Sequence, residues 1–114
     1  MPKVSPPLTP RLSRLLGDLG NRIRLARLRR QHSAETVAQR AGITRKTLSR
    51  VERGDGAVGL GIYSRVLQAL RLDQDLNSIA ADDILGRKLQ DAGIEPKRRA
   101  PKRLKILDDD EVIL

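Results

Sequence analysis

The sequence of 114 residues contains no cysteine. Disulfide bonds and thiolate metal sites are therefore excluded, and nothing indicates an oxidising compartment. Aromatic residues are almost absent, since Tyr63 is the only one and the chain has no Phe or Trp. The core must be built from Leu, Ile, Val and Ala, which suits small helices better than a β-sandwich. We therefore expect an all-α fold.

Long apolar runs are also missing. No stretch approaches the about 18 apolar residues that a membrane span requires, and the N-terminus lacks an apolar segment followed by a cleavage site. These absences predict a soluble, cytoplasmic protein that does not contact a membrane.

Residues suited to catalysis are few. The chain has one histidine, His32, no phosphate-binding glycine motif and no paired carboxylates in a plausible cleft. Acidic residues 108–111 could in principle hold a divalent ion, but we interpret them as a solvated tail because nothing fixes their geometry. We predict no enzyme activity, no catalytic residue, no metal site and no cofactor.

Charge divides sharply along the chain, whose formal net charge is +9. Residues 1–54 carry 13 Lys and Arg against 3 Asp and Glu, a net +10, whereas residues 55–95 carry 4 against 7, a net −3. A basic half beside a mildly acidic half is typical of polyanion binding, because each neutralised phosphate releases counterions. A generally basic, soluble surface is the alternative interpretation.

Four regions are predicted from the pattern of residues. Residues 1–10 form a flexible, Pro-rich lead-in, because four prolines remove backbone donors. Residues 11–81 form the folded domain, residues 82–95 an additional helix, and residues 96–114 a flexible tail that is first basic and then acidic.

The first helix is predicted from leucines spaced by three and four residues. Gly17 and Gly20 interrupt this pattern, so we expect a short or frayed turn followed by a firm helix from Leu19 to Gln31. The apolar positions of the pattern are Leu12, Leu15, Leu16, Leu19, Ile23 and Ala26.

Two short helices follow around one glycine. Ser33 is a good N-cap for a helix that runs to Ala41, and Gly42 can supply the left-handed residue that ends it. Thr44 then caps a third helix over residues 45–53, and Gly54 stops it. This is the sequence form of a helix-turn-helix, whose second helix enters the major groove of DNA.

The third helix is rich in exposed hydrogen-bond donors. Leu48 and Val51 are its only apolar residues and should face the core. The polar residues at its start and on its outer face are Thr44, Arg45, Lys46, Thr47, Ser49 and Arg50.

Later helices are predicted from apolar spacing. Leu76 and Ile79 indicate a short fifth helix, and Asp82 or Asp83 can cap a further one that ends near Gly93. The fourth helix has the stripe Ile62, Val66, Leu67 and Leu70.

The stretch LGNRIRLARLRRQHSAETVAQRAGITRKTLSRVERGDG resembles the Cro/C1-type (phage-repressor-like) helix-turn-helix family. VAQRAGITRKTLSRVERG carries that family's most diagnostic pattern, and IYSRVLQAL resembles its fourth helix. The resemblance covers residues 19–80. It implies a compact five-helix domain that binds a double-stranded DNA operator.

By position, the resemblance assigns roles to single residues. Arg45 and Lys46 fall where the family makes its main base contacts, and Thr47 and Ser49 where side or phosphate contacts occur. Arg50 and Arg53 fall where phosphate contacts are expected. Arg27 and Glu52 match a partly buried ion pair of the family, which we interpret as fixing helix packing without contacting DNA.

Two positions depart from the family pattern. Ala34 stands where many relatives place a Gln that touches phosphate, and Ser33 or Arg40 could replace that contact. His32 stands where a Leu is usual, and we interpret it as structural because no second metal ligand is nearby.

Single helix-turn-helix units normally bind DNA as symmetric dimers. We expect the dimer surface after the third helix, although about half of its apolar residues could pack within the monomer instead. The candidates are Leu60, Ile62, Tyr63, Leu67, Leu70, Leu72 and Leu76.

The segment LNSIAADDILGRKLQDAG, followed by a basic tail, resembles small antitoxins of the HipB group. This resemblance implies a repressor of its own operon that binds a HipA-like serine/threonine kinase toxin. A stand-alone transcriptional repressor and a basic interaction adaptor are the alternatives. In the tail, residues 97–105 could track DNA phosphates and residues 112–114 could dock in a partner groove, or the tail could be an unstructured extension.

Overall fold

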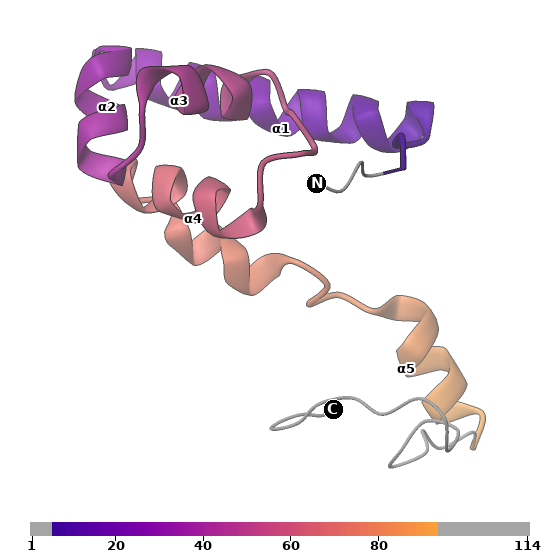
Figure 1. Ribbon diagram of the computed structural model, residues 1–114. Helices are drawn as coiled ribbons and strands as arrows, with labels where there is room; N and C mark the ends of the chain where they lie inside the picture. Colours follow the sequence, from indigo (N-terminus) through magenta and orange to yellow (C-terminus); the bar gives the residue numbers. More distant parts are fainter. Residues whose placement is uncertain (1–5, 94–114) are drawn as a thin grey trace. The chain divides into compact units, whose positions relative to one another are not determined.

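The computed structural model describes residues 6–93 (Figure 1). These residues form helices and connecting turns without any strand, which confirms the predicted all-α fold. They divide into two units, residues up to Ile79 and residues from Ala80, which are taken one at a time. The elements are α1 (Pro10–Arg29), α2 (Ala34–Ala41), α3 (Arg45–Glu52), α4 (Leu60–Ala69), the 3₁₀ helix η1 (Asp73–Ser78) and α5 (Ile84–Asp91).

The first helix is longer than predicted. α1 is one continuous helix of 20 residues, so the expectation of a frayed start before Leu19 was wrong. Its start is fixed by local chemistry, because Thr9 Oγ1 accepts a hydrogen bond from the amide of Leu12 and Pro10 occupies the first turn. Its end also differs: the helix stops at Arg29, and Gln31 has a φ of 57°, which a right-handed helix cannot include.

Gly20 marks the place where α1 crosses α3. A Cβ at this position would lie 2.5 Å from the Gly54 nitrogen and 2.6 Å from the Val51 carbonyl oxygen. Gly54 has a φ of 74°, and its surroundings are as tight as those of Gly20, because a Cβ added there would overlap the Leu16 carbonyl. The glycine that we expected to interrupt α1 therefore allows two backbones to touch, and packing against α3 supports the helix there.

The two short helices α2 and α3 begin and end by the predicted chemistry. Ser33 Oγ accepts from the Thr36 amide at 3.0 Å, and Thr44 Oγ1 accepts from the Thr47 amide at 3.1 Å. Gly42 ends α2 with a φ of 72°. Each hydroxyl satisfies an amide that the first turn of its helix leaves without a partner.

One aliphatic core joins the helices of the first unit. α1 packs on α3, and α2 packs on both α3 and α4. Tyr63 lies in this core and its hydroxyl donates a 2.8 Å hydrogen bond to the Asp55 carbonyl oxygen. The buried residues are Ile23, Ala26, Val37, Ala38, Ala41, Leu48, Val51, Tyr63, Val66, Leu67 and Leu70.

The apolar residues after α3 are mostly used inside the monomer. Of the seven candidates for a dimer surface, Tyr63, Leu67 and Leu70 are buried, and three more are partly buried against the core: Ile62, Leu72 and Leu76. Only Leu60, at 65%, is largely exposed. The predicted fifth helix is the 3₁₀ helix η1, and Ile79 lies just after it with 63% of its surface exposed. Little apolar surface is left there for a second molecule.

The second unit contains α5. The Asp83 carboxylate accepts from the Gly86 amide at 2.9 Å, so Asp83 is the cap, and Gly93 follows the helix with a φ of 83°. Ile84, Leu85 and Leu89 are exposed. The basic and acidic tail predicted for residues 96–114 lies outside the described residues. Among the helices of residues 6–93, none has the length and apolarity to cross a membrane.

Candidate nucleic-acid interface

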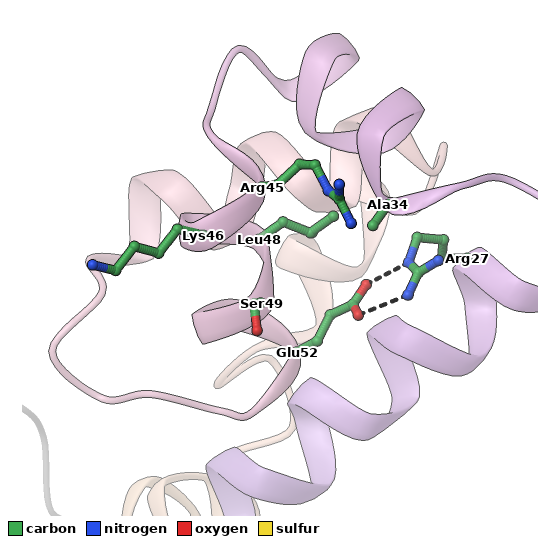
Figure 2. Close-up of a pocket in the computed structure, with 7 residues that line it drawn as sticks. All are labelled: Arg27, Ala34, Arg45, Lys46, Leu48, Ser49 and Glu52. Carbon is green, nitrogen blue, oxygen red and sulfur yellow. Dashed lines mark hydrogen bonds and ion pairs between the residues drawn. The ribbon is translucent and has the colours of Figure 1, made fainter.

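The side chains at the start of α3 lie at a cleft of about 380 Å³. Arg45, Lys46 and Ser49 are exposed, whereas Leu48 behind them is 1% exposed. This alternation follows from the helical period, because residues three and four apart share a face. The cleft is lined by Arg27, Ala34, Arg45, Lys46, Leu48, Ser49 and Glu52 (Figure 2).

Arg27 and Glu52 form a bidentate ion pair at this cleft (Figure 2). The Arg27 Nε donates to Glu52 Oε2 at 2.7 Å, and a terminal nitrogen donates to Oε1 at 3.0 Å. The other terminal nitrogen donates to the His32 carbonyl oxygen at 3.2 Å. The hydrogen bond to Glu52 raises the pKa of Arg27 above its usual range. One guanidinium thus ties α1 to α3 and to the turn before α2.

The pair changes what the cleft offers to a ligand. Both carboxylate oxygens of Glu52 already accept from Arg27, and the side chains are only 9% and 12% exposed. The charges of Arg27 and Glu52 therefore neutralise each other. Arg45 and Lys46 add positive charge at the start of α3, and neither forms an ion pair with another residue of 6–93. The N-terminus of α3 adds partial positive charge of its own.

The two arginines assigned to phosphates have protein partners. Arg50 Nε donates to the Asp55 carboxylate at 2.8 Å, and an Arg53 terminal nitrogen donates to Ser49 Oγ at 2.7 Å. Asp55 was not singled out as a partner of Arg50 by the sequence analysis. The hydrogen bonds from Arg50 and from the Ala57 amide hold the pKa of Asp55 below its usual range. The signal available in the sequence was an Arg and an Asp five residues apart across Gly54.

The other predicted residues lie around this surface in supporting positions. Thr44 and Thr47 bond each other through their hydroxyls at 3.0 Å, and the Ser33 hydroxyl is likewise engaged with Thr36. An Arg40 terminal nitrogen lies 3.4 Å from His32 Nε2. Ala34 lines the cleft, whereas Ser33 and Arg40 lie outside its lining.

Metal binding has no visible basis in the described chain. Within residues 6–93, no three His, Asp or Glu side chains gather as a metal site would require. The acidic run at residues 108–111 lies outside the described residues.

Comparison with known proteins gives one clear result. No curated protein matches the chain. A family model described as a helix-turn-helix domain matches residues 18–78, which is more than half of the sequence and includes α2, α3 and the whole cleft. A helix-turn-helix presents its second helix to the DNA major groove, and here that helix is α3 with its exposed Arg45 and Lys46. The chain therefore belongs to the helix-turn-helix domain family, and it is a DNA-binding protein.

Proposed function

We propose that this protein is a transcriptional repressor that reads a specific DNA operator with the first turns of α3. The observation that carries the proposal is the exposure of Arg45, Lys46 and Ser49 on one face of a helix whose other face, with Leu48 and Val51, is buried. Such a helix can enter a groove without giving up its packing.

Arg45 and Lys46 are the residues that read bases. An arginine can donate two hydrogen bonds to the O6 and N7 atoms of guanine, and a lysine can reach the same acceptors. Thr47 and Ser49 make side contacts, and Arg50 and Arg53 contact phosphates. Because Arg53 already donates to Ser49, and Arg50 to Asp55, their guanidinium groups are oriented before DNA arrives.

The repressor acts as a homodimer on a two-fold symmetric operator. A single helix-turn-helix reads too few base pairs for high specificity, and two copies on half-sites about 34 Å apart double the readout.

The second unit supports an antitoxin role. Ile84, Leu85 and Leu89 of α5 are 54%, 68% and 43% exposed. An amphipathic helix with bare apolar residues is suited to the groove of a partner protein. With the resemblance of this segment to antitoxins of the HipB group, this favours a HipA-like kinase toxin as partner and repression of the shared operon. A stand-alone repressor is the second candidate.

Operator binding is tested by nuclease protection on the DNA upstream of the protein's own gene. We expect a two-fold symmetric footprint. Replacing Arg45 or Lys46 with alanine should weaken specific binding roughly 5- to 160-fold, the effect of about 1–3 kcal/mol per base contact. Arg29→Ala removes the same charge outside the cleft lining and serves as the control. Equal loss in all three variants would show non-specific charge attraction and contradict the proposed reading.

The antitoxin role is tested separately by co-expressing the neighbouring reading frame. A stable complex should copurify, and Leu85→Glu with Leu89→Glu should disrupt it while the operator footprint stays. If no complex copurifies, the stand-alone repressor is the correct reading.

A further inference from the structure

The outer face of α3 carries hydrogen-bond donors in place of acceptors. Four of its five side chains are cations, and Lys and Arg side chains can only donate. No asparagine or glutamine occurs in α3, so the face lacks the amide group that offers a donor and an acceptor together. The residues of this side of the helix and its C-cap, which we name the donor face, are Arg45, Lys46, Ser49, Arg50 and Arg53.

The two acidic side chains beside the donor face are already engaged. Glu52 accepts through both carboxylate oxygens from Arg27, at 2.7 and 3.0 Å. Asp55 also uses both of its oxygens, because one accepts from Arg50 Nε at 2.8 Å and the other from the Ala57 amide at 2.8 Å. Each oxygen is thus held by a protein donor, and accepting from the amino group of a base would mean sharing or losing that hydrogen bond.

The Ser49 hydroxyl is oriented by its neighbour. Its Oγ accepts a 2.7 Å hydrogen bond from a terminal nitrogen of Arg53. Among residues 6–93 this hydroxyl donates to no protein atom, unlike that of Ser64, which donates to the Leu60 carbonyl oxygen at 2.8 Å. A hydroxyl has one hydrogen to donate, and a charged donor on its oxygen polarises it further. Ser49 therefore meets DNA as a donor.

From the donor face we infer that each operator half-site presents adjacent guanines to the start of α3. In the major groove guanine offers two acceptors, O6 and N7, whereas adenine offers one acceptor beside its N6 amino donor and cytosine offers only its N4 amino donor. An amino group placed against Arg45 or Lys46 would leave two donors facing each other without a partner. The inference rests on the proposed function and names the bases that its ligand must present.

The donors are spaced to meet about three base pairs. Figure 2 shows the side chains of Arg45 and Lys46 extending to different sides of α3, so each takes its own guanine. Ser49 lies about 6 Å from Arg45 along the helix axis, which is close to two base steps of about 3.4 Å. A hydroxyl donor needs one acceptor, which a purine N7 or the thymine O4 supplies and cytosine does not. The inferred block is two guanines beside a base other than cytosine.

The first test uses the full chain and a library of duplexes with random sequence. Sequencing of the bound duplexes should return a motif with two adjacent guanines in each half-site. Replacing one of these guanines with 7-deazaguanine, which has a carbon in place of the N7 acceptor, should weaken binding by about fivefold or more. The same replacement at a guanine outside the motif is the control and should leave the affinity unchanged.

The second test changes the base preference from the protein side. Arg45→Gln puts a donor and an acceptor at the first position, which match the N7 and N6 of adenine. The wild type should prefer the guanine site to the adenine-substituted site by about tenfold or more, and Arg45→Gln should reverse this preference. Arg29→Gln makes the same exchange outside the cleft lining and should keep the preference for guanine. Loss of a phosphate contact cannot reverse it, because such a loss weakens all sequences alike.

The possible outcomes separate the inference from the proposed function. Lys46→Gln repeats the second test at the neighbouring position, should Arg45→Gln bind neither site. A motif of A·T pairs alone, binding that 7-deazaguanine leaves unchanged, or failure of both glutamine variants to prefer adenine would each overturn the inference and leave the proposed function standing. A library that yields no motif at all would overturn the proposed function, and the inference with it.

Discussion

The ion pair between Arg27 and Glu52 gives the sharpest prediction about stability. Glu52→Gln keeps the size of the side chain and removes its charge, so the Arg27 guanidinium stays in place without a counter-charge. Removing one partner of a fully buried pair costs about 3–5 kcal/mol. Because Arg27 is 12% exposed and can recover some hydration, we expect a loss of about 2–3 kcal/mol in the free energy of unfolding.

The measurements are urea denaturation, for the free energy of unfolding, and a thermal melt, both followed by circular dichroism. For a domain of this size each kcal/mol lowers the unfolding temperature by about 4–8 °C, so the melt should fall by about 10–20 °C. Replacing both partners, Arg27→Met with Glu52→Leu, should recover most of the loss, because Arg27→Met removes the charge that a change at Glu52 alone would leave stranded. Asp82→Asn, which breaks the exposed pair with Arg87, is the control and should change the melt little.

Operator affinity separates a structural role from a reading role. Because both Glu52 oxygens bind Arg27, Glu52→Gln should leave the affinity of the folded protein within about threefold of wild type, a difference below 1 kcal/mol. A loss of stability below about 1 kcal/mol, far under the buried-pair range, would refute the reasoning about burial. A large loss of affinity in the folded protein would instead place Glu52 among the DNA contacts.

Three further predictions follow from single contacts. Gly20→Ala should destabilise the fold by about 2–4 kcal/mol in a denaturation series, because the added Cβ meets backbone atoms of α3 and of Gly54. Gly17→Ala places its Cβ in open space and should stabilise α1 by about 0.5–1 kcal/mol. Equal effects of the two substitutions would contradict the close crossing at Gly20. The pKa of the Asp55 carboxyl is lowered in the folded protein, so its charged form stabilises the fold at pH values above the ordinary carboxyl pKa, and this stability is lost as pH falls through the lowered pKa. Asp55→Asn should therefore flatten the decline of the unfolding temperature below about pH 4. An unchanged pH profile would exclude this role. Ala34→Gln should strengthen operator binding about fivefold, because it adds one hydrogen bond to phosphate worth about 1 kcal/mol. Fluorescence anisotropy measures the affinity, and Ala57→Gln, outside the cleft lining, is the control. No gain in affinity would mean that the DNA backbone lies out of reach of residue 34.

Features set by local chemistry could be predicted from the sequence. Ser33, Thr44 and Gly42 act within a few residues of their own positions, so the bounds of α2 and α3 were predicted to within a residue. The buried and exposed faces of α3 could also be predicted, because the helical period assigns Leu48 and Val51 to the core and exposes Arg45 and Lys46.

Features set by tertiary contacts could not be predicted. Gly20 reads locally as an interruption, and only the backbone of α3 shows that it permits a crossing. Tyr63 and Leu67 look available for a dimer until α2 is packed on α4. The pairing of Arg50 with Asp55 depends on the turn at Gly54, whose geometry joins two residues that lie on no common helix. The DNA-contact roles of single residues stay predictions.

The crossing of α1 and α3 at Gly20 and Gly54 has a consequence for how such a protein can change its target. Main-chain atoms meet there, so the tilt of α3 does not depend on which side chains it carries toward DNA. Arg45, Lys46 and Ser49 could therefore be exchanged, by natural divergence or by a designer, while the frame that presents them is inherited unaltered. Operator preference and scaffold would evolve as separable traits, with the two glycines as the fixed part.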